Sequence, residues 1–200
     1  AYDPSISVRY INHPSQLGSP DLIILPGSKN TIDDLIHLKQ QGMEKVILSC
    51  HKKGSLIMGI CGGFQMLGNI IRDPQNVEGK NIESTGLGLF DLETIFESEK
   101  LTRQVELTTV ESSIFKAGLT CHGYEIHVGR TTFKTPYLSL FTSPEDENPM
   151  NFGIINQEGT VLGTYLHGFL DNNLFRQELL CYIREQRNVN QPSKPFDFTQ

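Results

Sequence analysis

The chain has 200 residues, of which 38% are hydrophobic and 20% are charged. This length fits one domain, and this composition is typical of a soluble globular protein whose core needs no disulfide or metal. The net charge of −6 and the lack of a Lys/Arg run argue against nucleic-acid binding. No apolar run is long enough to span a membrane.

Three segments of the first half of the chain predict strands. The apolar runs 21–25 and 55–60 each lead into a glycine-containing turn, which is typical of strands buried on both faces of a parallel sheet. Residues 5–11 alternate loosely and favour an opening strand.

Helical patterns separate and follow these strands. Thr31 is predicted to cap a helix that carries two carboxylates in its first turn. Apolar residues recur at helical spacing over 43–50, and 64–67 reads as a further short helix. This order of elements favours an α/β fold with a doubly wound, mostly parallel sheet flanked by helices.

The second half of the chain predicts antiparallel strands added to that sheet. Segments 104–110 and 124–133 read as strands with no helix between them, and 152–155 and 161–165 are expected to pair as a hairpin. Apolar residues on one face predict a last helix over 173–187.

We expect residues 1–187 to form one domain and 188–200 to form a tail. Because Ala1 is preceded by no Met and opens no signal peptide, we interpret the chain as part of a longer protein. The four cysteines form no CxxC pair, which favours free thiols in a reducing cytoplasm. Cys121 and His122 are adjacent and lack zinc spacing, so we expect no metal site.

The segment Gly59-Ile60-Cys61-Gly62-Gly63 has the layout of a nucleophile elbow, with an apolar strand before it and a helix after it. Such a turn exposes the central side chain at the carboxyl edge of a sheet. The helix N-terminus is expected to favour the thiolate, and a backbone N–H after the nucleophile can stabilise an oxyanion. The alternative is that Cys61 is a small core residue.

A thiolate nucleophile needs a general acid, and His167 is the best candidate. It ends an apparent strand and precedes a glycine, where its ring can reach a cleft, although a loop histidine with satisfied hydrogen bonds and no catalytic role would look the same. A polar strand pattern places Glu125 and His127 on one face of another strand. The turn at Gly27 either is a plain turn or points an N–H at the thiolate. It lacks the spacing of a phosphate-binding loop, so we expect no nucleotide there.

Four segments together resemble the glutamine amidotransferase domains of the cobyric acid synthase family in the cobalamin pathway. They occur in the same order and span most of the chain from Val8 to Arg187: Leu25-Pro26-Gly27-Ser28-Lys29-Asn30-Thr31, Gly59 to Gly68, Gly123 to Arg130, and Gly163-Thr164-Tyr165-Leu166-His167-Gly168.

The resemblance implies glutaminase chemistry. Cys61 would attack the side-chain amide of glutamine, His167 would protonate the released ammonia, and water would hydrolyse the thioester. Gly27 and Gly62 would supply the oxyanion N–H groups, and Gln65 would shape the glutamine pocket.

The resemblance also implies partners. The domain would be the C-terminal half of a protein whose N-terminal synthetase domain uses ATP and Mg to activate carboxylates of a bound corrin. No cofactor is expected in the amidotransferase domain itself. We expect the domain on its own to hydrolyse glutamine slowly, because such coupling usually works by assembling the site on closure.

One position departs from the common triad pattern. A glutamate two residues after the histidine usually orients it, and here that position is Phe169. The cobalamin branch is similar in lacking that acid. Glu125 and Asp171 are both candidates for orienting His167, and the sequence does not choose between them.

Other readings share parts of this pattern. The same chemistry could serve another acceptor, as in cobyrinic acid a,c-diamide synthase or the amidotransferase subunit of cell-wall lipid isoglutaminyl synthase. The domain could also be a non-catalytic partner-binding module, or a cysteine hydrolase of a different substrate.

Overall fold

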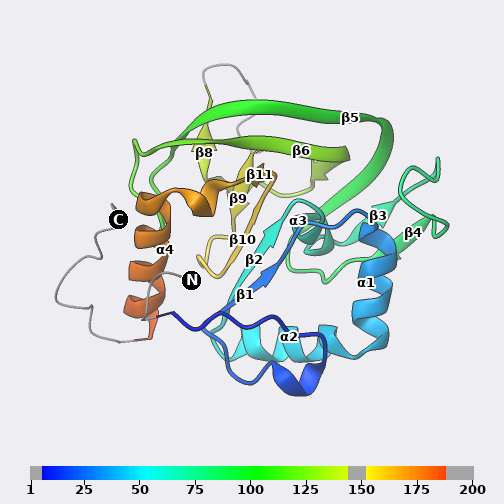
Figure 1. Cartoon of the computed structure of the whole chain (residues 1–200), viewed down its shortest axis with the longest axis horizontal. Coiled ribbons are helices and arrows are strands. Elements are labelled where there is room, and N and C mark those ends of the chain that lie inside the picture. Colours follow the sequence, from blue (N-terminus) through cyan, green and yellow to red (C-terminus); the bar gives the residue numbers. More distant parts are fainter. Residues whose placement is uncertain (1–5, 144–151, 188–200) are drawn as a thin grey trace.

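The computed structural model describes residues 6–143 and 152–187 (Figure 1). The helices are α1 (Thr31–Gln40), α2 (Met43–Lys52), α3 (Gly62–Met66) and α4 (Asn173–Gln186), with short 3-10 turns η1 (Pro14–Gln16) and η3 (Phe169–Asp171). The strands are β1 (Leu22–Leu25), β2 (Leu56–Ile60), β3 (Ile70–Arg72), β4 (Glu83–Thr85), β5 (Leu92–Thr109), β6 (Thr120–Phe133), β7 (Leu138–Ser139), β8 (Phe141–Thr142), β9 (Gly153–Ile155), β10 (Val161–Thr164) and β11 (Leu166–His167).

The first sheet has the strand order β1-β2-β10-β9-β7. Strand β2 pairs in parallel with β1 on one side and with β10 on the other, while β9 and β7 continue the sheet antiparallel. The predicted α/β class is confirmed, and so is the hairpin between β9 and β10.

Alternating side chains of this sheet fill two separate cores. Ile57 of β2 and Val161 of β10 belong to a core shared with α1 and α2. Met58 and Leu162, one residue further along, belong to a core shared with α4 and β5. The apolar runs are therefore continuous because both faces are covered by other elements. Figure 1 shows α1 and α4 on opposite sides of the molecule.

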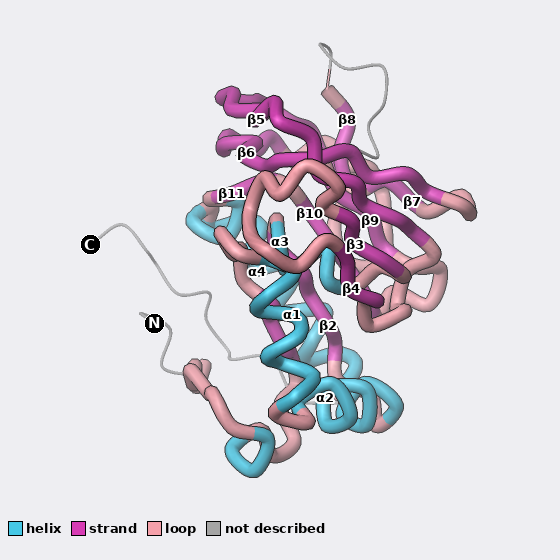
Figure 2. The backbone as a smooth tube through the Cα atoms, turned by 90° about the vertical axis from the view of Figure 1, so that its right-hand side faces the viewer, coloured by secondary structure: helices cyan, strands magenta, loops and turns pink. Residues whose placement is uncertain are grey.

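The second sheet is mostly antiparallel, with the strand order β11-β6-β5-β3-β4. Its long strands β5 and β6 lie across the end of the molecule toward which β1 and β2 run (Figures 1 and 2). Of the antiparallel strands predicted for the second half, 104–110 and 124–133 thus belong to a second sheet over the carboxyl edge of the first, whereas the hairpin of β9 and β10 is added to the first sheet. The predicted strand 104–110 is the last part of β5, which begins at Leu92.

One of the short segments that join the two sheets leads to His167. β10 ends at Thr164 in the first sheet, and β11 begins at Leu166 in the second. Only Tyr165 lies between them, and it is almost completely buried. The segment ending at His167 therefore carries a residue of the second sheet to the edge of the first.

Three local expectations were wrong. Residues 6–12 are irregular where a strand was predicted, because they pair with no strand of either sheet. β1 is an edge strand, so Ile24 is 41% exposed instead of buried. Asn30 caps α1 in place of Thr31, and neither offers a side-chain cap hydrogen bond. The predicted tail, 188–200, lies outside the described residues.

Candidate active site

Cys61 stands on a sharp turn between β2 and α3. Its backbone has φ = 52°, a left-handed conformation that is uncommon for a residue with a side chain. A Cβ at Gly63 would lie 2.0 Å from the carbonyl oxygen of Leu25, so the turn packs directly on the end of β1. The sequence therefore needs glycine here, and the predicted strand–turn–helix layout of the elbow is confirmed.

Cys61, Gly27 and His167 come together at the junction of the two sheets. A Cβ placed on Gly27 would lie 3.6 Å from Cys61 Cβ and 3.5 Å from His167 Cε1. Cys61 belongs to the edge of the first sheet, whereas His167 belongs to β11, opposite Tyr124 of β6. The geometry thus unites three residues that are far apart in the sequence.

The backbone of β6 also reaches this junction. The thiol of Cys61 donates to the carbonyl oxygen of Ile126, with Sγ and O 3.2 Å apart, and His167 Nε2 lies 3.3 Å from the same oxygen. Sequence reasoning missed Ile126, because a backbone carbonyl leaves no signature in residue type.

Burial dominates the acidity of Cys61. Desolvation raises the pKa of its thiol, and the negative charge of Glu78 adds to this rise. The backbone N–H of Gly62 and the positive charge of Lys100 lower it, but their combined effect is smaller. The N–H of Gly62, the first residue of α3, favours the thiolate as expected, but desolvation of the thiol outweighs it.

The loop that carries Gly27 packs against the elbow. A Cβ on Gly62 would lie 3.0 Å from the backbone nitrogen of Ser28, so the two turns touch through backbone atoms. Gly27 and Gly62 therefore flank Cys61 from two different loops. Their oxyanion role stays a prediction.

Gln65 lies one turn after the nucleophile and is buried. Its side-chain nitrogen donates to the carbonyl oxygen of Val128, at 3.1 Å, two residues along β6 from Ile126. The side-chain amide of Gln65, which was predicted to shape a glutamine pocket, is therefore bound to the backbone of β6.

Glu125 does not orient His167. Its buried carboxylate pairs with Arg103 of β5, with Nε and Oε2 2.6 Å apart, and with His127, with Nε2 and Oε1 3.0 Å apart. The β6 strand turns Glu125 and Ile126 to opposite faces, so the carboxylate points away from the ring of His167. Glu125 is thus an acidic residue next to the site, but its carboxylate contacts Arg103 and His127 instead of His167.

Asp171 does not orient His167 either. It is exposed, and its carboxylate lies near Gly168, where a Cβ would be 3.7 Å from Oδ2. Within the described residues, the ring of His167 has a single hydrogen-bond partner, the carbonyl oxygen of Ile126.

Two further groups near the site escaped sequence reasoning. Tyr165 stacks on His127, with ring centroids 3.9 Å apart, and its hydroxyl contacts Thr131. Complete burial raises the pKa of Tyr165 to about 12. Glu78 accepts a hydrogen bond from the backbone nitrogen of Thr31 at 2.7 Å, and burial raises its pKa.

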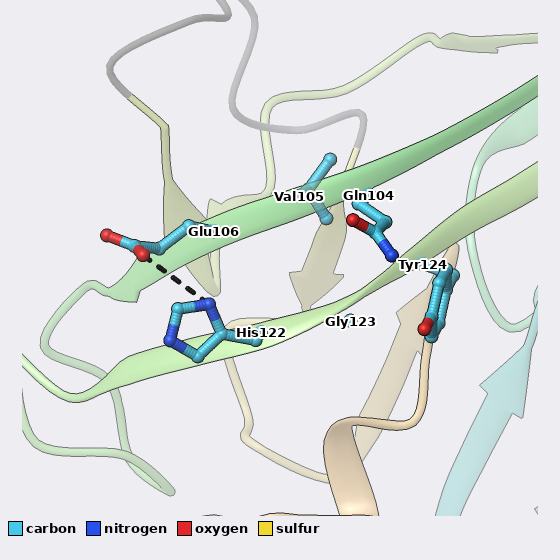
Figure 3. Close-up of a pocket in the computed structure, with 6 residues that line it drawn as sticks. All are labelled: Gln104, Val105, Glu106, His122, Gly123 and Tyr124. Carbon is cyan, nitrogen blue, oxygen red and sulfur yellow. Dashed lines mark ion pairs between the residues drawn. The ribbon is translucent and has the colours of Figure 1, made fainter.

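A separate hollow of about 350 Å³ lies on the outer side of the β5–β6 pair (Figure 3). An ion pair between His122 Nδ1 and Glu106 Oε2, 3.4 Å apart, lies at one end, and Tyr124 lies at the other. None of the predicted site residues lines it.

All four cysteines are free. Within 6–143 and 152–187, no cluster of His, Cys, Asp or Glu is arranged to hold a metal ion. None of the helices in this part of the chain is long and apolar enough to cross a membrane.

The chain is similar to a known protein family and to part of longer named proteins. The model of the CobB/CobQ-like glutamine amidotransferase domain matches residues 1–175. A cobyric acid synthase of Clostridium tetani is 39% identical over 192 residues, covering 94% of this chain and 38% of that protein. A cobyric acid synthase of Alkaliphilus metalliredigens is 46% identical over 177 residues, covering 83% of this chain and 34% of that protein. The chain thus spans less than two fifths of the length of these relatives.

Solved structures share the fold at lower identity. The structure of PurLQS from Thermotoga maritima superposes with a TM-score of 0.66 at 22% identity, covering 88% of this chain and 85% of that chain. A crystal structure of a glutamine amidotransferase gives a TM-score of 0.59 at 18% identity, covering 92% of this chain and 88% of that chain.

Proposed function

Because this chain belongs to the CobB/CobQ-like glutamine amidotransferase family, we propose that it hydrolyses glutamine to glutamate and ammonia through Cys61. One observation carries this proposal: a strained cysteine, a histidine and a glycine turn from three separate segments meet within van der Waals reach. Their residue types are those that nucleophilic catalysis on an amide needs.

The reaction has two halves. The Cys61 thiol loses its proton to His167, and the thiolate attacks the amide carbon of glutamine. The N–H groups of Gly27 and Gly62 stabilise the oxyanion, and the C–N bond breaks as the imidazolium of His167 protonates the departing ammonia. Water, deprotonated by His167, then attacks the γ-glutamyl thioester and releases glutamate and the Cys61 thiol. Glutamine and water are consumed, and glutamate and ammonia are formed.

The fate of the ammonia is proposed from the relatives. The matched relatives named cobyric acid synthase are more than twice as long as this chain, which supports a synthetase part in the same protein. We propose that this part binds ATP, Mg and a corrin, and that the ammonia amidates activated corrin carboxylates. The free thiols fit a reducing cytoplasm, the location that we propose.

The test compares two cysteine substitutions by glutaminase assay. Cys61→Ala is expected to lose at least about a thousandfold in kcat/KM, because it removes the nucleophile. Cys181→Ala is the matched control, since this free thiol lies on α4. It is expected to keep wild-type activity. Equal activity of Cys61→Ala and wild type would falsify the proposal.

A second variant separates the acid from the nucleophile. His167→Asn keeps a polar side chain but cannot shuttle a proton. It is expected to lower kcat by about a hundredfold or more and to change KM little. A change confined to KM would assign His167 to substrate binding instead.

A further inference from the structure

Every side chain of the proposed machinery that carries a hydrogen-bond donor is bound to the backbone of β6. The Cys61 thiol and His167 Nε2 share the carbonyl oxygen of Ile126, at 3.2 and 3.3 Å. The amide of Gln65 donates to the carbonyl oxygen of Val128 at 3.1 Å. A peptide carbonyl thus already fills the position between nucleophile and acid.

The acceptor fixes where the protons are. A carbonyl oxygen accepts hydrogen bonds and donates none, so both the Cys61 sulfur and His167 Nε2 must carry a proton in this state. A protonated Nε2 has no lone pair to take the thiol proton, and an amide carbonyl is no base. In the described part of the chain, sulfur and imidazole form no hydrogen bond with each other. The nucleophile is therefore switched off by the contact that holds it.

A buried ionic network anchors this stretch of β6 on both sides of Ile126. Glu125 is 1% exposed and binds Arg103 of the neighbouring strand. The same carboxylate binds His127, whose other ring nitrogen lies 3.2 Å from the carbonyl oxygen of Gly129. His127 in turn stacks on Tyr165, a residue that links the two sheets.

The structure assigns an autoinhibitory role to residues 125–128 of β6, here called the blocking strand. We propose that its carbonyl groups occupy the glutamine site, that the Arg103–Glu125–His127 network holds it closed, and that glutamine binds only after it has moved away. This inference rests on the proposed function and adds to it how the site is kept inactive. Glu125 is then a positioning residue that acts through Ile126.

The strand and the substrate compete, and this gives the proposal a quantitative signature. If only a fraction of the molecules is open, the apparent dissociation constant for glutamine equals that of the open form divided by the open fraction. The turnover rate of the glutamine-bound enzyme does not change. Loosening the anchor should therefore lower KM and leave kcat as it was. The alkylation rate of Cys61 by a small reagent should rise by the same factor by which KM falls, because both follow the open fraction.

The first experiment measures alkylation of Cys61 by iodoacetamide from pH 7 to 10, with peptide mass spectrometry to locate the label. It needs no glutaminase activity, so its failure is distinguishable from failure of the proposed function. Glu125→Gln keeps the volume of the side chain but removes the charge that binds Arg103. We expect alkylation about tenfold faster at pH 7.5, a lower pH midpoint, and a KM for glutamine reduced by the same factor.

The pH midpoint also reports on the other charges that face Cys61. Lys100 of β5 and Glu78 of the loop between β3 and β4 shift it in opposite directions, and Tyr165 and His167 are the remaining titratable neighbours. Glu125→Gln also removes a negative charge beside Ile126, which by itself lowers the pKa of the thiol, so a lower midpoint supports movement of the strand only together with the lower KM.

The same pair of strands offers a matched control. Glu106 and His122 lie opposite each other on β5 and β6, as Arg103 and Glu125 do, and form an exposed ion pair away from the site (Figure 3). Glu106→Gln removes a charge from the same hairpin and should leave the alkylation rate, its midpoint and KM at wild-type values. Glu125→Asp, which keeps the charge, should return part of the way to wild type.

Two results would overturn the proposal. One is unchanged Cys61 alkylation and KM in a folded Glu125→Gln variant. The other is a fall in kcat without any gain in reactivity, which is what a purely structural role would give.

A second measurement covers the case in which Glu125→Gln does not fold. Hydrogen exchange of the wild-type chain is recorded before and after Cys61 is labelled with 6-diazo-5-oxo-norleucine. The label is a glutamine analogue and fills the site. Amides of residues 124–130 should lose protection when the blocking strand is displaced, and unchanged protection in the labelled protein would contradict its displacement.

Discussion

The elbow between β2 and α3 and the blocking strand of β6 both contact Cys61, but different forces hold them. The elbow is held by close backbone packing, with Gly63 pressed against Leu25 and no room for a methyl group. The blocking strand is held by its backbone pairing with β5 and, in addition, by charges, through one buried carboxylate and its two partners. Close packing permits a single arrangement, whereas an ionic network can be opened by a change of charge or by a competing ligand. The nucleophile is thus fixed on one side and releasable on the other.

The largest effect is expected from a substitution in the elbow, where the backbone is closely packed. Gly63→Ala places a methyl carbon 2.0 Å from a backbone oxygen, so the turn or β1 must move. We expect a loss of at least about 3 kcal/mol in the free energy of unfolding, or no folded protein. The measurement is urea denaturation followed by circular dichroism.

Gly42→Ala is the control for this substitution. Gly42 has φ = 76° and no atom within 4 Å of an added Cβ, so its cost is only conformational, about 1 kcal/mol. A Gly63→Ala variant as stable as Gly42→Ala would mean that the elbow yields as easily as an open turn.

The next largest effect is expected from a substitution in the ionic network that anchors the blocking strand. Glu125→Gln weakens charge-assisted hydrogen bonds to Arg103 and His127 inside the protein, and we expect a loss of about 1–2 kcal/mol in the free energy of unfolding. Glu106→Gln removes the exposed pair with His122 and should cost less than about 0.5 kcal/mol. Equal losses in the two variants would show that burial does not distinguish these pairs.

A smaller effect concerns Glu78, a carboxylate that binds the start of α1 near the elbow. Glu78→Gln weakens the bond to the backbone nitrogen of Thr31 at the start of α1, and we expect a loss of about 0.5–1 kcal/mol. Because the charge of Glu78 raises the pKa of Cys61, the substitution should also lower the pH midpoint of its alkylation. Glu44→Gln, in the first turn of α2, is the control and should leave that midpoint in place.

The smallest effect is a pH dependence of stability that comes from Cys61 itself. Burial raises the pKa of the folded thiol, so the unfolded chain ionises first as pH rises. The stability of the wild type relative to Cys61→Ser should therefore be constant below the ordinary pKa of a thiol and fall as pH rises toward the folded value. Urea denaturation of both proteins between pH 7 and 10 measures this. A relative stability that rises with pH would mean that the elbow's preference for the thiolate outweighs desolvation.

The packed side was largely predictable from the sequence, because its signals are local. A run such as 55–60, followed by glycines and a helix, specifies strand, turn and helix within a dozen residues. His167 was also located by its strand end. The hairpin of β9 and β10 and the helix α4 followed from patterns of the same short range.

The contacts of the blocking strand were not predictable in the same way. Arg103 carries no motif, and the pairing of β5 with β6 brings it to Glu125 across 22 positions. The contact made by Ile126 belongs to a backbone atom that every residue has. The formation of two sheets, and not one, depends on where β5 packs. Only the fold determines these features.

The arrangement of His167 and Cys61 on different sheets has a consequence for refolding. Thr164 of β10 pairs with Ile60 of β2 and stands only three residues before His167, so the imidazole comes near the sulfur when β10 joins β2 in the first sheet. Contacts between segments distant in sequence form late, since their loops are costly to close. Recovery of enzyme activity after dilution from denaturant therefore times the pairing of β10 with β2, and it should lag behind the return of the far-ultraviolet circular dichroism signal.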